Sequence, residues 1–96
     1  MREKDIEAYL RKQVKSIGGR AYKFESPGNA GVPDRLVLFP GGRAAFVELK
    51  APGKKPTALQ LAQGKKISGL GFTVLVIDSK EGVDEFIREH QEVGCK

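Results

Sequence analysis

Cysteine is almost absent from this sequence, which has a single one, Cys95, among its 96 residues. A disulfide framework and a thiolate metal cluster are both excluded, because each needs more than one cysteine. No apolar run approaches the roughly 18 residues of a membrane span, and the N-terminus is charged where a signal peptide has an apolar block. These absences predict a cytoplasmic protein that has no membrane partner.

Histidine is equally scarce: His90 stands alone near the C-terminus, where we expect a surface position without a chemical role. The chain is 40% hydrophobic and 30% charged, which is typical of a soluble globular protein. Its length suits one domain over residues 1–96, with a frayed tail at 91–96. The net charge of +5 favours a polyanionic partner.

Hydrophobic periodicity predicts helices in three places. Residues 2–17 carry apolar side chains at helical spacing and end at Gly18-Gly19, where a left-handed cap is expected. A second helical pattern begins at Thr57 and ends in another pair of glycines. Asp78 and Glu81 have the spacing of a capping box, so the last helix is predicted to begin there.

Apolar runs predict four strands, at residues 20–26, 34–39, 43–50 and 72–78. The middle two form a hairpin, and strand 43–50 is expected to be central and buried on both faces. The continuous β-branched run 72–78 predicts a buried strand, and because a helix precedes it, it can lie parallel to its neighbour. The fold class is therefore α/β, a mixed β-sheet with flanking helices in the order α-β-β-β-α-β-α.

Charged residues stand at the ends of the two hairpin strands. Glu48 and Lys50 are two residues apart, so both project from one face, and the Leu49 carbonyl lies near the same edge. Asp34 opens the preceding antiparallel strand, and counting back from the turn puts it opposite residues 48–50 within a residue or two. Two carboxylates and an ammonium are thus predicted to meet at one edge of the sheet.

This set of groups suits phosphodiester hydrolysis. Carboxylates and a backbone carbonyl are hard ligands for Mg²⁺ or Mn²⁺, which lower the pKa of a bound water while a nearby ammonium orients it or stabilises the transition state. Two simpler interpretations stay open. Glu48 and Lys50 could form an ion pair on a solvated strand, and Pro33-Asp34 could be ordinary turn chemistry.

Pro33-Asp34 followed by Glu48-Leu49-Lys50 resembles the PD-(D/E)xK nuclease pattern. The surrounding segment is similar to the VRR-Nuc branch, whose small stand-alone members have a restriction endonuclease-like core and occur in phages and bacteria; it reads SPGNAGVPDRLVLFPGGRAAFVELKAPGKKPTALQ. The resemblance implies that Asp34, Glu48 and the Leu49 carbonyl bind the metal. It also implies that Lys50 acts on the attacking water.

The resemblance implies two further site residues. Related nucleases use a glutamate of the first helix, a position that Glu7 fits best and Glu3, one turn earlier, second best. The residues alone favour a solvated helix position for Glu7 over a role in the site. Gln60 matches a family glutamine near the site, and its spacing from Thr57 is also that of a capping box.

Two loops are candidates for DNA contacts. The glycine-rich loop with Ser26, Gly28 and Gly31 would let backbone approach a phosphate closely, or it is an ordinary flexible loop. Lys54 and Lys55 would favour a DNA backbone beside a hydrolytic site, or they are solubilising charges.

The resemblance implies a divalent-metal endonuclease selective for branched DNA such as four-way junctions. Its stand-alone relatives resemble Holliday junction resolvases and work as homodimers in a bacterial or phage-infected cell. Since two symmetric cuts need two active centres, a two-fold dimer is expected, with the outer face of the first helix as the candidate interface. A different hypothesis is a basic DNA-binding module without catalysis, which predicts salt-sensitive binding but no metal-dependent cleavage.

Overall fold

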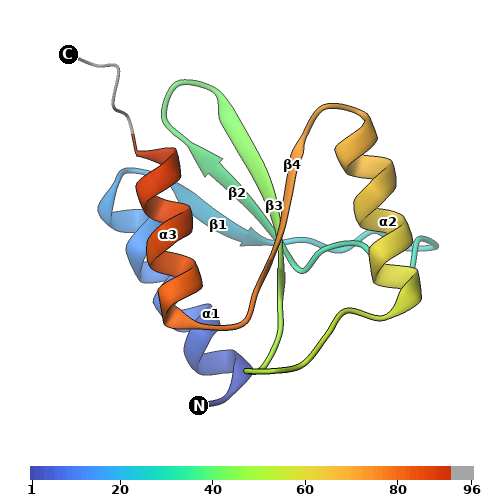
Figure 1. The fold of residues 1–96 in the computed structure, drawn as a ribbon. Helices are drawn as coiled ribbons and strands as arrows, with labels where there is room; N and C mark the ends of the chain where they lie inside the picture. Colours follow the sequence, from blue (N-terminus) through green and yellow to red (C-terminus); the bar gives the residue numbers. More distant parts are fainter. Residues whose placement is uncertain (92–96) are drawn as a thin grey trace.

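Residues 1–91 are described by a computed structural model, in which helices and strands follow one another in the predicted order (Figure 1). The elements are α1 (Glu3–Ser16), β1 (Arg20–Lys23), β2 (Arg35–Phe39), β3 (Arg43–Leu49), α2 (Ala58–Gly69), β4 (Thr73–Ile77) and α3 (Lys80–His90). The predicted order α-β-β-β-α-β-α is therefore confirmed. Cys95 and the predicted frayed tail beyond residue 91 lie outside the described residues.

The strands form one sheet in the order β1-β2-β3-β4. The first three are antiparallel neighbours, and β4 pairs parallel to β3 after the crossover through α2, as the sequence predicts. The hairpin closes at Phe39 opposite Arg43, through Gly41 and Gly42, whose φ values of +89° and +79° favour glycine. Strand β3 is therefore central, and Val47, Glu48 and Leu49 near its end are all buried, as expected.

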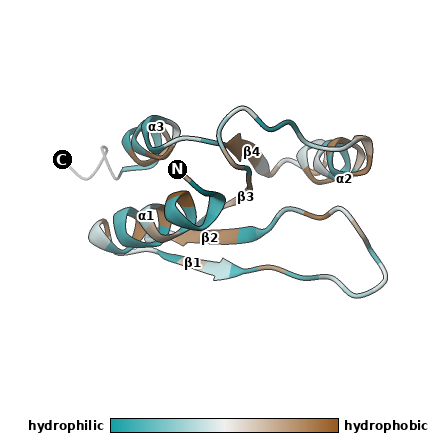
Figure 2. Ribbon diagram, turned by 90° about the horizontal axis from the view of Figure 1, so that it is seen from below, coloured by the Kyte–Doolittle hydropathy of each residue, from teal (hydrophilic) through white to brown (hydrophobic). Residues whose placement is uncertain are grey.

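The sheet separates α1 and α3 on one face from α2 on the other (Figures 1 and 2). Helices α1 and α3 pack on each other and on the sheet, and they contribute the apolar stripes that helical spacing predicts. The core lies between them and the inward face of the strands; it contains Ile6, Leu10, Val14, Val37, Phe39, Ala45, Val47, Leu49, Ile77, Val83, Phe86 and Ile87. The carboxyl end of β3 is anchored in this layer through Val47 and Leu49.

Two glycines terminate α1. Gly18 has φ +87°, and the N–H groups of Gly18 and Gly19 donate to the carbonyls of Lys15 and Val14 at 3.0 and 2.9 Å, which is a Schellman motif. A Cβ on Gly19 would stand 2.5 Å from the Leu38 carbonyl oxygen, so only glycine allows β1 to leave the helix so tightly. As a result β1 runs back along α1.

Strand β4 differs from the sequence prediction, because it is an edge strand rather than a buried one. Val76 is 47% exposed on the face that α2 covers only in part. Helix α2 itself has no buried residue, and its Leu59 and Leu61 are more than half exposed. A β-branched run predicts that a strand forms. How deeply the strand is buried depends on how much of it the neighbouring helix covers.

Two expectations about the last helix are wrong. The N-cap of α3 is Ser79, whose Oγ accepts a hydrogen bond from the Gly82 N–H at 2.9 Å, whereas the Asp78 carboxylate accepts one from the Gly53 N–H at 3.3 Å. His90 is half-buried rather than a surface residue. Its ring stacks on Phe39 at 5.0 Å because the end of α3 lies against the hairpin, and its carbonyl accepts a hydrogen bond from Arg43 at 2.7 Å.

Candidate active site

Asp34 lies directly before β2, at the edge where β3 ends. Its Oδ2 accepts a hydrogen bond from the Leu49 backbone N–H at 3.0 Å. Since Arg35 pairs with Val47, the antiparallel register places Asp34 opposite Glu48 and on the same face. The hairpin therefore brings the two carboxylates together.

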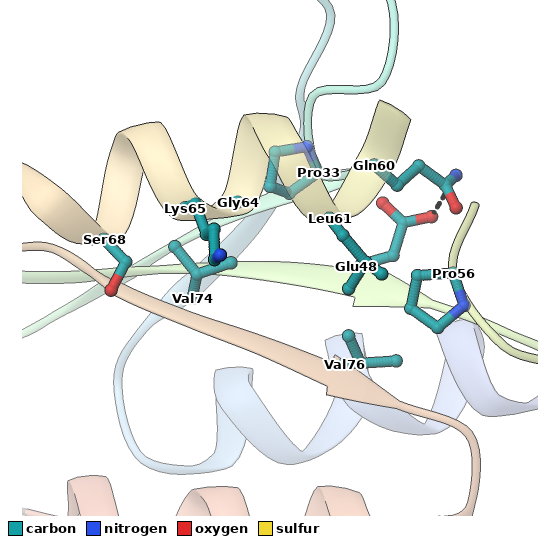
Figure 3. A pocket seen from close by; sticks show the side chains of 10 residues that line it. All are labelled: Pro33, Glu48, Pro56, Gln60, Leu61, Gly64, Lys65, Ser68, Val74 and Val76. Carbon is teal, nitrogen blue, oxygen red and sulfur yellow. Dashed lines mark hydrogen bonds between the residues drawn. The ribbon is translucent and has the colours of Figure 1, made fainter. Parts of the chain in front are cut away.

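Glu48 is the one buried charged residue in the described part of the chain, with 5% of its surface exposed. Its Oε2 lies 3.6 Å from Lys50 Nζ and accepts a hydrogen bond from Gln60 Nε2 at 2.7 Å, while its buried Oε1 has no partner among residues 1–91 (Figure 3). Burial and then the charge of Asp34 raise the pKa of Glu48 to about 7, against the lowering effect of Lys50. An excess of negative charge is thus held at this point.

Gln60 has its orientation fixed by the start of α2. Thr57 is the N-cap, and its Oγ1 accepts a hydrogen bond from the Gln60 N–H at 3.2 Å, while Gln60 Oε1 accepts one from the Thr57 N–H at 2.9 Å. This is a complete capping box. Because the amide oxygen is engaged by the cap, the amide nitrogen points at Glu48, so Gln60 has the structural role and also contacts the site.

Glutamates of the first helix lie on the other side of Asp34. Glu3, Glu7 and Asp34 line one hollow of about 340 Å³, and Glu7 forms an ion pair there with Arg35. Glu3 forms no salt bridge with residues 1–91, and its charge contributes to the raised pKa of Glu48. Of the two helix-one candidates, Glu7 is therefore engaged by a cation and Glu3 is not.

The donor set fits a hard divalent cation. No group of three or more carboxylate, imidazole or thiol side chains within residues 1–91 is arranged to hold a metal ion. Of the ligands that the resemblance implies, Asp34 and Glu48 lie close enough for their charges to interact, and Glu7 pairs with Arg35. A hard divalent cation held by Asp34 and Glu48 would provide a partner for the Oε1 of Glu48 and would relieve the mutual repulsion of the two carboxylates.

No protein-family model matches the chain, but two known proteins are similar to it over most of its length. The chain is 53% identical over 81 residues to "Putative nuclease p44" of Acyrthosiphon pisum secondary endosymbiont phage 1, covering 84% of this chain and 87% of that protein. It is 31% identical to a solved structure described as a VRR-Nuc domain, with a TM-score of 0.85, covering 92% of this chain and 96% of that one. The chain belongs to the VRR-Nuc family. The resemblance found in the sequence and the fold class are both confirmed.

The glycine-rich loop of this VRR-Nuc domain packs on α2. The Ser26 carbonyl and Oγ accept hydrogen bonds from Asn29 N and Nδ2 at 3.0 and 2.9 Å, which makes a compact turn. Gly31 has φ +92°, and a Cβ there would stand 2.8 Å from Leu59 Cγ, whereas a Cβ on Gly28 would meet nothing within 4 Å. The absence of a side chain at Gly31 therefore allows the loop to pack closely on α2, whereas a side chain at Gly28 would point into open space.

Lys54 and Lys55 are exposed in the loop between β3 and α2, which connects Lys50 to Thr57. The Lys54 N–H donates to the Ala51 carbonyl at 3.0 Å, so this loop begins with an ordered turn. Neither ammonium group forms a salt bridge with another residue of 1–91.

A groove of about 240 Å³ runs from Glu48 between α2 and β4 (Figure 3). Figure 3 shows Leu61 and Val76 on its walls, with the Glu48 carboxylate at one end beside Gln60 and Pro56. The apolar walls remove water from one side of Glu48, which is the physical cause of its raised pKa.

Two contacts in this VRR-Nuc site do not follow from the sequence: the ion pair of Arg35 with Glu7 and the hydrogen bond from Gln60 to Glu48. Arg35, next to Asp34, was not singled out, although an arginine beside a predicted carboxylate cluster is a natural counter-ion. Thr57 was identified only as part of a cap. Its Thr-x-x-Gln spacing was the available signal, but the contact between Gln60 and Glu48 depends on how α2 docks on the sheet.

Proposed function

We propose that this VRR-Nuc protein is an endonuclease that hydrolyses DNA phosphodiester bonds with Mg²⁺ or Mn²⁺. The observation that carries the proposal is the meeting of Asp34, Glu48 and Lys50 at one edge of the sheet, held by the Asp34–Leu49 hydrogen bond and the Lys50–Glu48 ion pair. The name of the phage relative supports the nuclease class.

In the proposed site Asp34, Glu48 and the Leu49 carbonyl would hold the metal. When bound, the ion would neutralise charge on the phosphodiester and lower the pKa of a water. Lys50, only 17% exposed, would direct its ammonium at the attacking water or at the charge that develops on the phosphate. Gln60 would hold Glu48 in place through its 2.7 Å hydrogen bond.

DNA would be held in part by basic and glycine-rich loops beside the site. The net charge of +5 supports a polyanionic substrate. Lys54 and Lys55 would contact the backbone, and the turn with Ser26 and Gly28 would approach a phosphate. The close packing of Gly31 on Leu59 would hold that turn in place.

We further propose branched DNA, such as a four-way junction, as the preferred substrate and a homodimer as the active form. The outer face of α1, the candidate interface from the sequence, carries many exposed charged side chains, and such residues are depleted at the centre of interfaces. Exposed apolar side chains gather instead on α2 and the adjoining sheet face, including Leu61, Leu70 and Phe72 at 55%, 77% and 48% exposure. A mass measurement in solution on wild type and Leu70→Glu tests this assembly.

The place of work would be the cytoplasm of a bacterial or phage-infected cell, where such DNA is found. The phage source of one relative supports this. No helix within residues 1–91 has the length and apolar character needed to cross a bilayer.

The decisive experiment is cleavage of four-way, flap and linear DNA by wild type, Lys50→Ala and Glu48→Gln, in Mn²⁺, Mg²⁺ or EDTA. We expect metal-dependent nicking by wild type, strongest on junctions, and its loss in both variants. A wild type that binds every substrate and cuts none would establish the alternative, a basic DNA-binding module.

A further inference from the structure

A second hollow, of about 420 Å³, lies between the C-terminal half of α1 and the start of β1, away from the carboxylates. Four cationic side chains line it: Arg11, Lys12, Lys15 and Arg20. No acidic side chain does, although the chain has 12 acidic residues. The hollow is therefore strongly positive.

These four cations have no ion-pair partner in the described part of the chain. Arg11 follows Glu7 by four residues, but Glu7 is engaged by Arg35 instead. Arg11 and Lys15 are themselves a like-charged i,i+4 pair, which destabilises a helix by a few tenths of a kcal/mol. A cation in the last turn of a helix is stabilised by the helix dipole, which explains the position of Lys15 but not of the other three cations.

The cationic hollow continues the candidate active site. Helix α1 runs along β1 (Figure 2). Both hollows are lined by residues of these two elements: Glu3 and Glu7 line the hollow that contains Asp34, and Arg11 and Lys15 line the other. From Glu7 to Lys15 the helix rises about 12 Å, which spans about three or four phosphates of one DNA strand. The lining residues of α1 thus change from acidic to basic over a distance that suits a nucleic-acid backbone.

We infer that Arg11, Lys12, Lys15 and Arg20 form a binding site for the phosphodiester backbone of the DNA arm that leaves the cleavage position along α1. The inference rests on the proposed function, since it takes DNA as the ligand. The site adds affinity and fixes the direction of the arm, because phosphate contacts position a protein on nucleic acid without reading sequence.

The test measures binding without catalysis. Arg11→Gln combined with Lys15→Gln is compared with Lys66→Gln combined with Arg88→Gln, exposed cations that line none of the hollows described; each pair lowers the net charge from +5 to +3. Binding to a fluorescent four-way junction is followed in EDTA over a range of salt concentrations. The first pair should lower affinity at least about tenfold and reduce the salt slope by about two, while the control pair stays close to wild type.

Equal affinities and slopes for the two pairs would overturn the inference, because overall charge would then explain the binding. That outcome is independent of whether wild type cuts DNA, so it does not bear on the nuclease proposal. On a substrate whose nick has been mapped, a neutral methylphosphonate about three or four nucleotides from the nick should weaken wild type. It should not weaken DNA binding by the Arg11→Gln, Lys15→Gln double variant any further. An equal loss of affinity in both proteins would also overturn the inference.

Discussion

The Asp34 carboxylate is bound to the backbone of the neighbouring strand, where its Oδ2 accepts the Leu49 N–H at 3.0 Å. This single bond continues the hairpin ladder by one residue beyond β2. It places one carboxylate beside Glu48 and against the Leu49 backbone, so the chemistry proposed for the site depends on this strand end.

Replacing Asp34 separates its structural role from its chemical one. An amide oxygen can still accept the Leu49 N–H, so Asp34→Asn should melt like wild type, while Asp34→Ala should lose about 1 kcal/mol. Both should lose cleavage yet keep or tighten DNA binding in EDTA, because a carboxylate repels phosphate. Thermal melting, nicking and anisotropy measure the three effects. Wild-type cutting by Asp34→Ala would refute the assignment.

Glu48 should make the metal-free protein less stable as pH rises. Its pKa is raised from 4.5 to about 7 by folding, so the native state holds a proton that the unfolded state has released. Stability from this group is therefore complete below about pH 4.5 and is lost as pH rises through about 7. Glu48→Gln does not titrate, so its advantage over wild type in urea unfolding should grow between about pH 5 and about pH 8. Parallel pH profiles for the two proteins would contradict this expectation.

Thr57 should affect catalysis as well as stability. Thr57→Ala removes the oxygen that accepts the Gln60 N–H, which should cost about 1 kcal/mol and loosen the amide that contacts Glu48. Cleavage at limiting Mn²⁺ should fall several-fold, and Thr57→Ser should restore it.

The matched control for Thr57 is Ser79→Ala, which removes the N-cap oxygen of α3 and touches no site residue. It should cost a similar amount of stability with cleavage unchanged at a temperature where both variants are folded. Equal cleavage by the Thr57→Ala and Ser79→Ala variants would reduce Thr57 to a helix cap.

Two glycines of the same loop should respond differently. Gly31→Ala would place a Cβ 2.8 Å from Leu59 Cγ and should destabilise the protein more than Gly28→Ala, which meets no atom and bears only the backbone cost of about 1 kcal/mol. Chemical denaturation of both variants checks the order.

Gly28 also tests the proposed phosphate contact of the loop. Aspartate and asparagine both tolerate a positive φ, so Gly28→Asp and Gly28→Asn differ mainly in charge. DNA affinity should fall for the aspartate variant and not for the asparagine variant. Equal affinities would remove the loop from the DNA site.

Glutamine variants of Glu3 and Glu7 should differ in their effects on stability and on Mn²⁺ binding. Glu7→Gln leaves the mostly buried Arg35 guanidinium without its carboxylate and should cost about 2 kcal/mol. Glu3→Gln should leave stability unchanged and weaken Mn²⁺ binding, because the Glu3 charge acts on Glu48. Calorimetric titration with Mn²⁺ on both variants decides which glutamate serves the metal, and unchanged Mn²⁺ affinity in Glu3→Gln would exclude Glu3.

The order of elements, the hairpin and the meeting of Asp34 with Glu48 and Lys50 can all be predicted from the amino-acid pattern. These follow from local rules, since side-chain alternation and a short turn fix which residues of two adjoining strands share a face. The Gly18-Gly19 stop is local as well, because it depends only on the φ angles that glycine permits.

How those elements cover one another follows from the packing of the folded chain and not from the amino-acid pattern. The exposure of Val76, the burial of His90 against Phe39 and the pairing of Glu7 with Arg35 each depend on where a helix docks, and many dockings satisfy the same pattern. Likewise, Gln60 is a cap in any version of α2, but it reaches Glu48 only because α2 lies over the end of β3. Burial and long-range polar contacts are properties of the assembled layers, which a linear pattern does not contain.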